Sequence, residues 1–186
     1  MPTGNDLRKG MAIKYNNEVC VVLDMQHRTP GNLRAFVQAS LRNLRTGKSM
    51  DVRFSSTEKV EVIPMEDKKM EFSYKDGEDF VFSDVDTYET ISLTPEIVGE
   101  APKYMTENAP VTIIFVGGNP VSVELPSSVV LTVAEAPEGI KGDSANNVQK
   151  TITLETGINI QAPLFIKTGE KIKVDTRNGK YMERAN

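Results

Sequence analysis

Short runs in which apolar and polar residues alternate fill the chain, and almost none of them repeats with the period of a helix. In AFVQASL at 35–41, Val37, Ala39 and Leu41 fall on one side and Gln38 and Ser40 on the other. The run MDVRFS at 50–55 alternates in the same way. A period of two residues is typical of a strand with one buried face, so these runs predict β-strands.

Tight turns separate the predicted strands. The tripeptides DGE at 76–78 and NGK at 178–180 are the strongest hairpin signals in the chain. The stretch RTGKS at 45–49 predicts another tight turn between the two runs described above. Strands this short and this regularly interrupted indicate small all-β barrels.

Helix is expected only at 94–105, where Thr94 can act as the N-cap and Pro95 as the first residue. Pro102 should limit this helix to about two turns. Proline and polar residues around Pro64 and Pro126 mark two boundaries. We therefore predict three small domains, at 1–64, 65–127 and 128–186.

The charge of the chain is unevenly distributed. The 186 residues are 39% hydrophobic and 26% charged, which is typical of a globular protein. Residues 1–63 contain ten basic and six acidic residues, a net charge of +4, so a total of −4 leaves −8 for the remainder. Such asymmetry indicates one end that faces nucleic acid, although ordinary scatter of surface charge explains it equally well.

Residues suited to catalysis or metal binding are scarce. The single histidine, His27, has no obvious carboxylate partner, and Cys20 lies inside the apolar run VCVVL, which favours a buried thiol. The sequence contains no phosphate-binding GxxxxGK[ST], no GxGxxG and no GxSxG. We expect a protein that is not an enzyme and uses no metal or cofactor. The N-terminus has no apolar segment of signal-peptide length and no run approaches the roughly 20 residues of a membrane span, which predicts a cytoplasmic protein that does not enter a membrane.

The stretch HRTPGNLRAF at 27–36 is the most unusual turn in the chain. It lies between two strand-like runs, so it reads as a hairpin tip, and it brings Arg28 and Arg34 to the two sides of Pro30 and Gly31. It is either a plain turn or a projection that enters a negatively charged cavity. Aromatic residues make up only 6% of the chain, which favours recognition of an RNA backbone and shape over stacking on bases.

Several motifs resemble the bacterial elongation factor P family over nearly the whole chain. The most specific is GINIQAPLFIKTGEKIKVDTRNGKY at 157–181, which is similar to the C-terminal signature of the family. NDLRKG at 5–10, LRNLRTG at 41–47 and GIKGDSA at 139–145 also match. Ala162 and Ile152 depart from the usual residues, and both are hydrophobic exchanges.

The resemblance implies an all-β fold of three barrels in an L shape that mimics tRNA. The first barrel would be SH3-like, of the KOW type, and the other two would be OB-folds. It implies a monomeric factor that binds the 70S ribosome, its rRNA and proteins, between the peptidyl-tRNA and exit sites. There it would position peptidyl-tRNA so that the ribosome joins consecutive prolines. Messenger RNA at the exit-site codon is a further implied partner.

The resemblance also assigns site residues. Pro30, Gly31, Asn32, Leu33 and Arg34 would form the tip that faces the peptidyl-transferase centre. Most family members have a modified Lys or Arg at the apex, where this chain has Asn32. We therefore expect an unmodified apex, or Arg34 as the nearby cation; the alternative is that Asn32 serves the turn alone, since Asn tolerates left-handed backbone angles.

Other candidates come from charge and from the same resemblance. Arg28, Arg42 and Arg45 are candidate contacts to tRNA or rRNA. Candidate contacts to the messenger or the small subunit are Gly142, Asp143, Ser144, Tyr181 and Arg184. An ordinary turn explains the first three of these equally well, and packing or solvated charge explains the last two. Two readings stay open beside the main one: a divergent paralogue of the family, and a general RNA-binding OB-fold protein.

Overall fold

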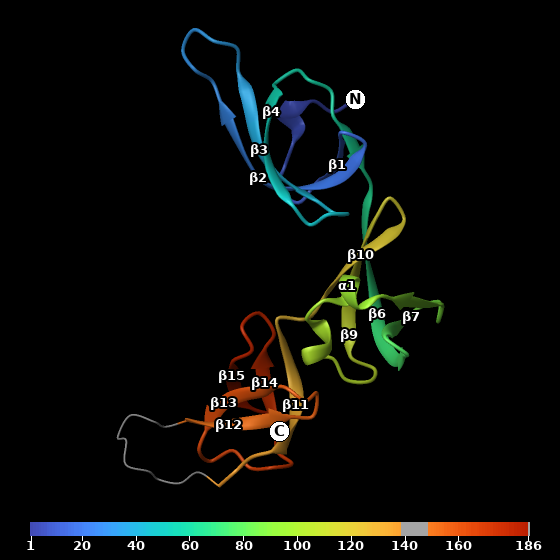
Figure 1. The fold of residues 1–186 in the computed structure, drawn as a ribbon, viewed down its shortest axis with the longest axis vertical. Coiled ribbons are helices and arrows are strands. Elements are labelled where there is room, and N and C mark those ends of the chain that lie inside the picture. The colour runs from blue at the N-terminus through green and yellow to red at the C-terminus, as the bar shows by residue number, and fades with distance from the viewer. Residues whose placement is uncertain (139–148, 186) are drawn as a thin grey trace. The chain divides into compact units, whose positions relative to one another are not determined.

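Three five-stranded sheets make up the protein, as the computed structural model shows for residues 1–138 and 149–185 (Figure 1). Helix is confined to three short segments in these ranges. Every strand pair with a defined register is antiparallel. The expected all-β class is confirmed.

Each sheet consists of five strands that are consecutive in chain order. The first has the order β4-β3-β2-β1-β5, the second β10-β9-β6-β7-β8, and the third β13-β12-β11-β14-β15. The strands of the first are β1 (Ala12–Tyr15), β2 (Glu18–Arg28), β3 (Phe36–Asn43), β4 (Ser49–Ser55) and β5 (Glu61–Ile63). Those of the second are β6 (Met65–Asp76), β7 (Asp79–Asp84), β8 (Thr90–Leu93), β9 (Pro110–Val116) and β10 (Asn119–Glu124). Those of the third are β11 (Ser128–Glu135), β12 (Gln149–Leu154), β13 (Asn159–Pro163), β14 (Lys171–Asp175) and β15 (Tyr181–Arg184).

The core of the first sheet follows the alternation of the sequence. Val37, Ala39 and Leu41 are fully buried, as one face of β3 should be. The first sheet also buries Cys20, and this burial raises the pKa of its thiol. Cys20 is therefore part of the packing, as its apolar surroundings in the sequence predict.

Part of the second sheet packs with the first sheet in one compact unit. The chain packs into two compact units, residues 1–67 with 114–121, and residues 68–113 with 122–186. Within the first of these, Ile114 and Val116 of β9 form a buried cluster with Ala12. The neighbouring Ile113 and Phe115 are buried as well, so both faces of the end of β9 are covered. This explains why VTIIFV at 111–116 is continuously apolar rather than alternating.

The expected helix begins where predicted but is shorter. α1 spans Pro95–Val98, follows Thr94, and is a single turn. Gly99 ends it with a φ of 58°, before Pro102 is reached. A 3-10 turn, η2 (Ala101–Lys103), follows, and a second one, η1 (Gly4–Asp6), lies at the N-terminus. The expectation of two helical turns was wrong because Gly99, which has a positive φ, ends the helix after one turn.

The turns predicted at DGE and NGK are both present. Gly77 has a φ of 62° and joins β6 to β7, where Asp76 pairs with Asp79. Gly179 has a φ of 71° in the turn between β14 and β15. No helix among the described residues is long and apolar enough to cross a membrane.

Candidate functional site

The hairpin of β2 and β3 carries the predicted tip beyond its barrel. The strands stay paired out to His27 with Val37 and Arg28 with Phe36, and the loop that joins them stands clear of the sheet (Figure 1). All residues from 31 to 34 are exposed, and Leu33 retains 70% of its accessible surface. The corner therefore projects into solvent rather than packing into the core.

A single hydrogen bond closes the tip. The Leu33 N–H donates to the Pro30 carbonyl at 3.0 Å, which places Gly31 and Asn32 at the centre of a four-residue turn. Neither central residue has a positive φ. A Cβ atom added to Gly31 would meet no atom within 4 Å. The left-handed geometry that would favour Asn is absent here, so the backbone does not explain Asn32.

Arginines flank an aromatic ring at the outer end of the hairpin. Phe36 lies opposite Arg28 on β2, and the Arg53 guanidinium carbon lies 3.6 Å from the centre of the Phe36 ring. Arg28 also donates to the Gln26 side chain at 3.0 Å. Arg53 was not among the contacts predicted from the sequence, although its place opposite the apolar residues of MDVRFS puts it on this outer face.

Arg42 lies on the same outer face, nearer the base of the hairpin. Asp24 and Asp51 both pair with Ser40 and separate Arg42 from the arginines near the tip. No ion pair holds Arg42 within the described ranges, and its side chain is exposed. The structure thus places two of the predicted RNA contacts, Arg28 and Arg42, on one surface.

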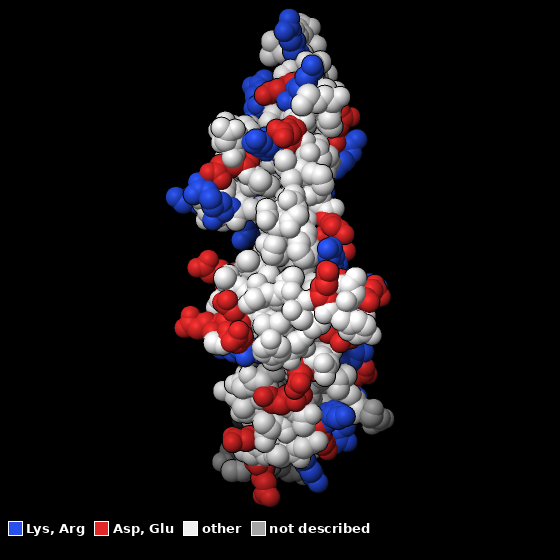
Figure 2. Space-filling view, turned by 90° about the vertical axis from the view of Figure 1, so that its right-hand side faces the viewer, with Lys and Arg blue, Asp and Glu red and all other residues white. Residues whose placement is uncertain are grey.

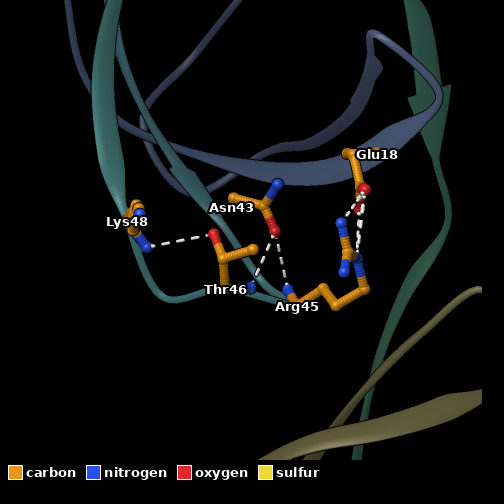
Figure 3. A network of polar contacts seen from close by, with 5 residues as sticks. All are labelled: Glu18, Asn43, Arg45, Thr46 and Lys48. Atoms are coloured by element: carbon orange, nitrogen blue, oxygen red, sulfur yellow. Dashed lines mark hydrogen bonds and ion pairs between the residues drawn. The ribbon is translucent and has the colours of Figure 1, made fainter.

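Arg45 differs from Arg42 because it is bound within the protein (Figure 3). Its guanidinium forms a bidentate ion pair with Glu18, with Nε 3.0 Å from each carboxylate oxygen. The buried Asn43 fixes the turn, since its Oδ1 accepts from the Arg45 N–H at 2.8 Å and the Thr46 N–H at 3.0 Å. The Arg45 hydrogen bonds lower the pKa of Glu18.

The C-terminal candidates also have partners inside the protein. Tyr181 is half-buried against the core of the third sheet. The Arg184 guanidinium lies 3.3 Å from a Glu170 carboxylate oxygen and 3.3 Å from the Phe165 carbonyl, to both of which it donates. Gly142, Asp143 and Ser144 lie outside the described residues.

The middle segment is the part of the chain with a net negative charge. Residues 65–127 contain thirteen acidic and four basic residues, a net charge of −9, whereas residues 128–186 contain seven acidic and eight basic residues, a net charge of +1. On the face shown in Figure 2, acidic groups predominate over the second sheet. An RNA surface would repel such a segment, so the candidate RNA contacts belong to the first and third sheets. The described residues contain no cluster of three or more His, Cys, Asp or Glu side chains that could hold a metal.

Comparisons with known proteins agree along the whole chain. Three family models match in order: "Elongation factor P (EF-P) KOW-like domain" at 3–60, "Elongation factor P (EF-P) OB domain" at 65–123, and "Elongation factor P, C-terminal" at 129–184. Elongation factor P of Acidobacterium capsulatum is 46% identical over 179 residues, which cover 96% of both chains. That of Salinispora tropica is 44% identical over 185 residues, covering 100% of both. The chain belongs to the elongation factor P family.

A solved structure has a similar fold. Eukaryotic translation initiation factor 5A from Methanococcus jannaschii superposes with a TM-score of 0.54. The match covers 66% of this chain and 92% of that protein, at 17% sequence identity. The likeness at this identity concerns the fold, and the family itself identifies the protein as a translation factor.

Proposed function

We propose that this protein binds the 70S ribosome between the peptidyl-tRNA and exit sites and promotes peptide-bond formation at consecutive prolines. It acts as a cytoplasmic monomer and is not an enzyme, because the ribosome forms the bond. Membership in the elongation factor P family supports this proposal. The observation that carries it is the exposed corner at Gly31 and Asn32, held out at the end of the paired strands β2 and β3.

Positioning is the physical effect that we propose. Proline has a locked φ and no N–H, so it reacts poorly as both peptidyl donor and acceptor. A protein tip that steadies the acceptor end of the peptidyl-tRNA reduces the number of unproductive arrangements, and this raises the rate without new chemistry. The paired strands beneath the tip give it the stiffness that such a role requires.

The apex is proposed to work without covalent modification. Asn32 carries neither the ammonium nor the guanidinium group that a modifying enzyme would extend. Arg34 is exposed and has no hydrogen bond or ion pair among the described residues, so it can supply a cation beside the apex. Intact-mass measurement of the protein from its own host tests this: the sequence mass is expected, and an added group that maps to residues 28–34 would refute it.

Translation of a polyproline reporter tests the function. Purified ribosomes stalled on consecutive prolines should resume when the wild-type protein is added, and a matched reporter without prolines should not respond. Asn32→Ala removes the polar group and should weaken the rescue, whereas Asn32→Lys tests whether a cation replaces it. Absence of any response to the wild-type protein would refute the proposal.

The unusual apex favours a second candidate, a paralogue with altered stall specificity. Reporters that vary the residues around the proline pair distinguish the two functions. A general elongation factor P should relieve most of these stalls, and a specialised paralogue only a subset. Binding to naked oligonucleotides in moderate salt separates both from a general RNA-binding protein, since a translation factor should bind them weakly.

A further inference from the structure

Phe165 is an exposed aromatic residue in the segment that joins β13 to β14. It retains 55% of its accessible surface, whereas the next residue, Ile166, is completely buried in the core of the third sheet. A single exposed hydrophobic residue is common in proteins and carries no meaning alone. The contacts of the Phe165 ring distinguish it from the other exposed residues.

The Arg184 side chain lies against one face of the ring. Its guanidinium carbon is 4.6 Å from the ring centre. Arg184 is fixed there by its bonds to the Phe165 carbonyl and to Glu170, each 3.3 Å long. Glu170 is fixed in turn, because its other oxygen accepts from the Lys167 N–H at 3.3 Å. The ring is thus backed by a planar cation, and more than half of Phe165 is still accessible.

The segment that carries this pair also carries unpaired positive charge. The three acidic residues between 163 and 185 are all in ion pairs: Glu170 with Arg184 at 3.3 Å, Asp175 with Arg177 at 2.7 Å, and Glu183 with Lys173 at 3.1 Å. Three exposed lysines of the same segment have no ion pair within the part of the chain that the structure describes: Lys167, Lys171 and Lys180. The unpaired charge of this segment is therefore positive.

We propose that Phe165, backed by Arg184, is a stacking platform for one unpaired base of single-stranded RNA. This inference rests on the proposed function, which brings the protein to ribosome-bound RNA. Proteins hold splayed-out bases by stacking them on aromatic rings and guanidinium planes, and lysines beside the platform attract the phosphates. Messenger RNA and a single-stranded segment of rRNA present the same chemistry. In the second sheet Lys75 lies 5.4 Å from the centre of the Phe80 ring, but residues 65–127 carry a net charge of −9, which repels phosphates.

Crosslinking from position 165 tests the partner directly. A photoreactive phenylalanine analogue at 165, in the full-length protein on programmed ribosomes, should crosslink to RNA. Primer extension on the messenger and on rRNA then shows which of the two supplies the base. A crosslink to ribosomal protein only, or none, would overturn the platform.

Substitutions at Phe165 test the stacking. Phe165→Trp and Phe165→Tyr keep an aromatic face and should bind ribosomes as the wild type does. Phe165→Leu keeps a large apolar side chain without the ring and should weaken ribosome binding about tenfold, as expected for loss of one stacked base. Equal binding by Phe165→Leu would overturn the inference, since a merely apolar contact with protein tolerates leucine.

The controls separate failure of the platform from failure of the proposed function. If the wild-type protein neither binds ribosomes nor relieves the proline stall, the proposed function fails. If it does both and Phe165→Leu behaves identically, only the platform fails. Thermal unfolding of each variant confirms that it is folded, and should Phe165→Leu be unfolded, the crosslink decides alone.

Discussion

The Arg177 side chain forms a bidentate ion pair with the carboxylate of Asp175, two residues earlier, at the turn between β14 and β15. Its Nη2 lies 2.7 Å from one oxygen and its Nε 3.0 Å from the other, and the Arg177 N–H adds a third bond at 2.8 Å. The Asp175 side chain is only 9% exposed. The guanidinium, followed by the backbone hydrogen bond, lowers the pKa of Asp175 from 3.8 to about 2.

A lowered pKa makes the turn sensitive to acid. A carboxylate whose folded pKa lies below its unfolded value stabilises the fold fully above the unfolded value, and this stability is lost as the pH falls through the folded value. For Asp175 this loss should therefore occur between pH 3.8 and about 2. Asp175→Asn should be less stable than the wild type at pH 7, with the difference shrinking across that window. Denaturant unfolding at several pH values measures this, with Asp76→Asn in an exposed turn as the control; a difference that is independent of pH would contradict the assignment.

Arg42 and Arg45 should differ in their effect on ribosome binding. Arg42 is unpaired on the outer face of the hairpin among the described residues, whereas Arg45 is held by Glu18. Arg42→Glu should weaken binding most at low ionic strength, and the difference from the wild type should shrink as salt screens the charges. Arg45→Ala should have a smaller effect. Affinity measured over a salt series tests the pair, and an Arg42→Glu protein that binds like the wild type at every salt concentration would place Arg42 away from RNA.

Much of the first sheet could be predicted from the sequence because its information is local. The alternation through Val37 and Leu41 correctly indicated which face is buried, and in the second sheet the glycine in DGE correctly marked a turn. The exposed corner at Gly31 also follows from a polar stretch between two strand-like runs. In each case the neighbouring residues alone decide the outcome.

The remaining features depend on residues far apart in the chain. Glu18 and Arg45 are separated by 27 positions, and Phe165 and Arg184 by 19, so no local sequence pattern predicts either contact. The packing of Ile114 against Ala12 appears in the sequence only as an apolar run whose partner is unknown. At Asn32 the sequence misleads, because asparagine suggests left-handed geometry that the backbone does not adopt.

Asn43 should contribute to stability more than its place beside a turn suggests. Its buried side chain accepts two backbone N–H groups, those of Arg45 and Thr46. Asn43→Ala leaves both donors without this acceptor, and a loss of about 1–3 kcal/mol in the free energy of unfolding is expected. Urea unfolding measures the loss. Asn32→Ala is the matched control, since Asn32 is exposed and should change stability by less than about 0.5 kcal/mol; equal effects of the two substitutions would show that the Asn43 bonds contribute little.

Substitution by alanine should lower the stability of the protein at one glycine and leave it unchanged at another. A Cβ atom on Gly4 would lie 2.5 Å from the Ser55 carbonyl oxygen and 3.2 Å from the Phe54 Cβ, whereas one on Gly31 would meet nothing within 4 Å. Gly4→Ala must therefore displace a strand and should cost about 1–3 kcal/mol of stability. Gly31→Ala should unfold at the wild-type temperature, because neither space nor φ opposes it.

In rescue of the polyproline reporter, Gly31→Ala should be the more damaging substitution, although Gly4→Ala lowers stability more. At a temperature where both variants are folded, Gly4→Ala should retain activity, since Gly4 is buried beneath β4 and not at the tip. Gly31→Ala should lose activity, because the added methyl group enlarges the apex, which must fit into the proposed RNA cavity. Full activity of Gly31→Ala, together with lost activity of a folded Gly4→Ala, would mean that the tip makes no close approach and that the hairpin acts through another surface.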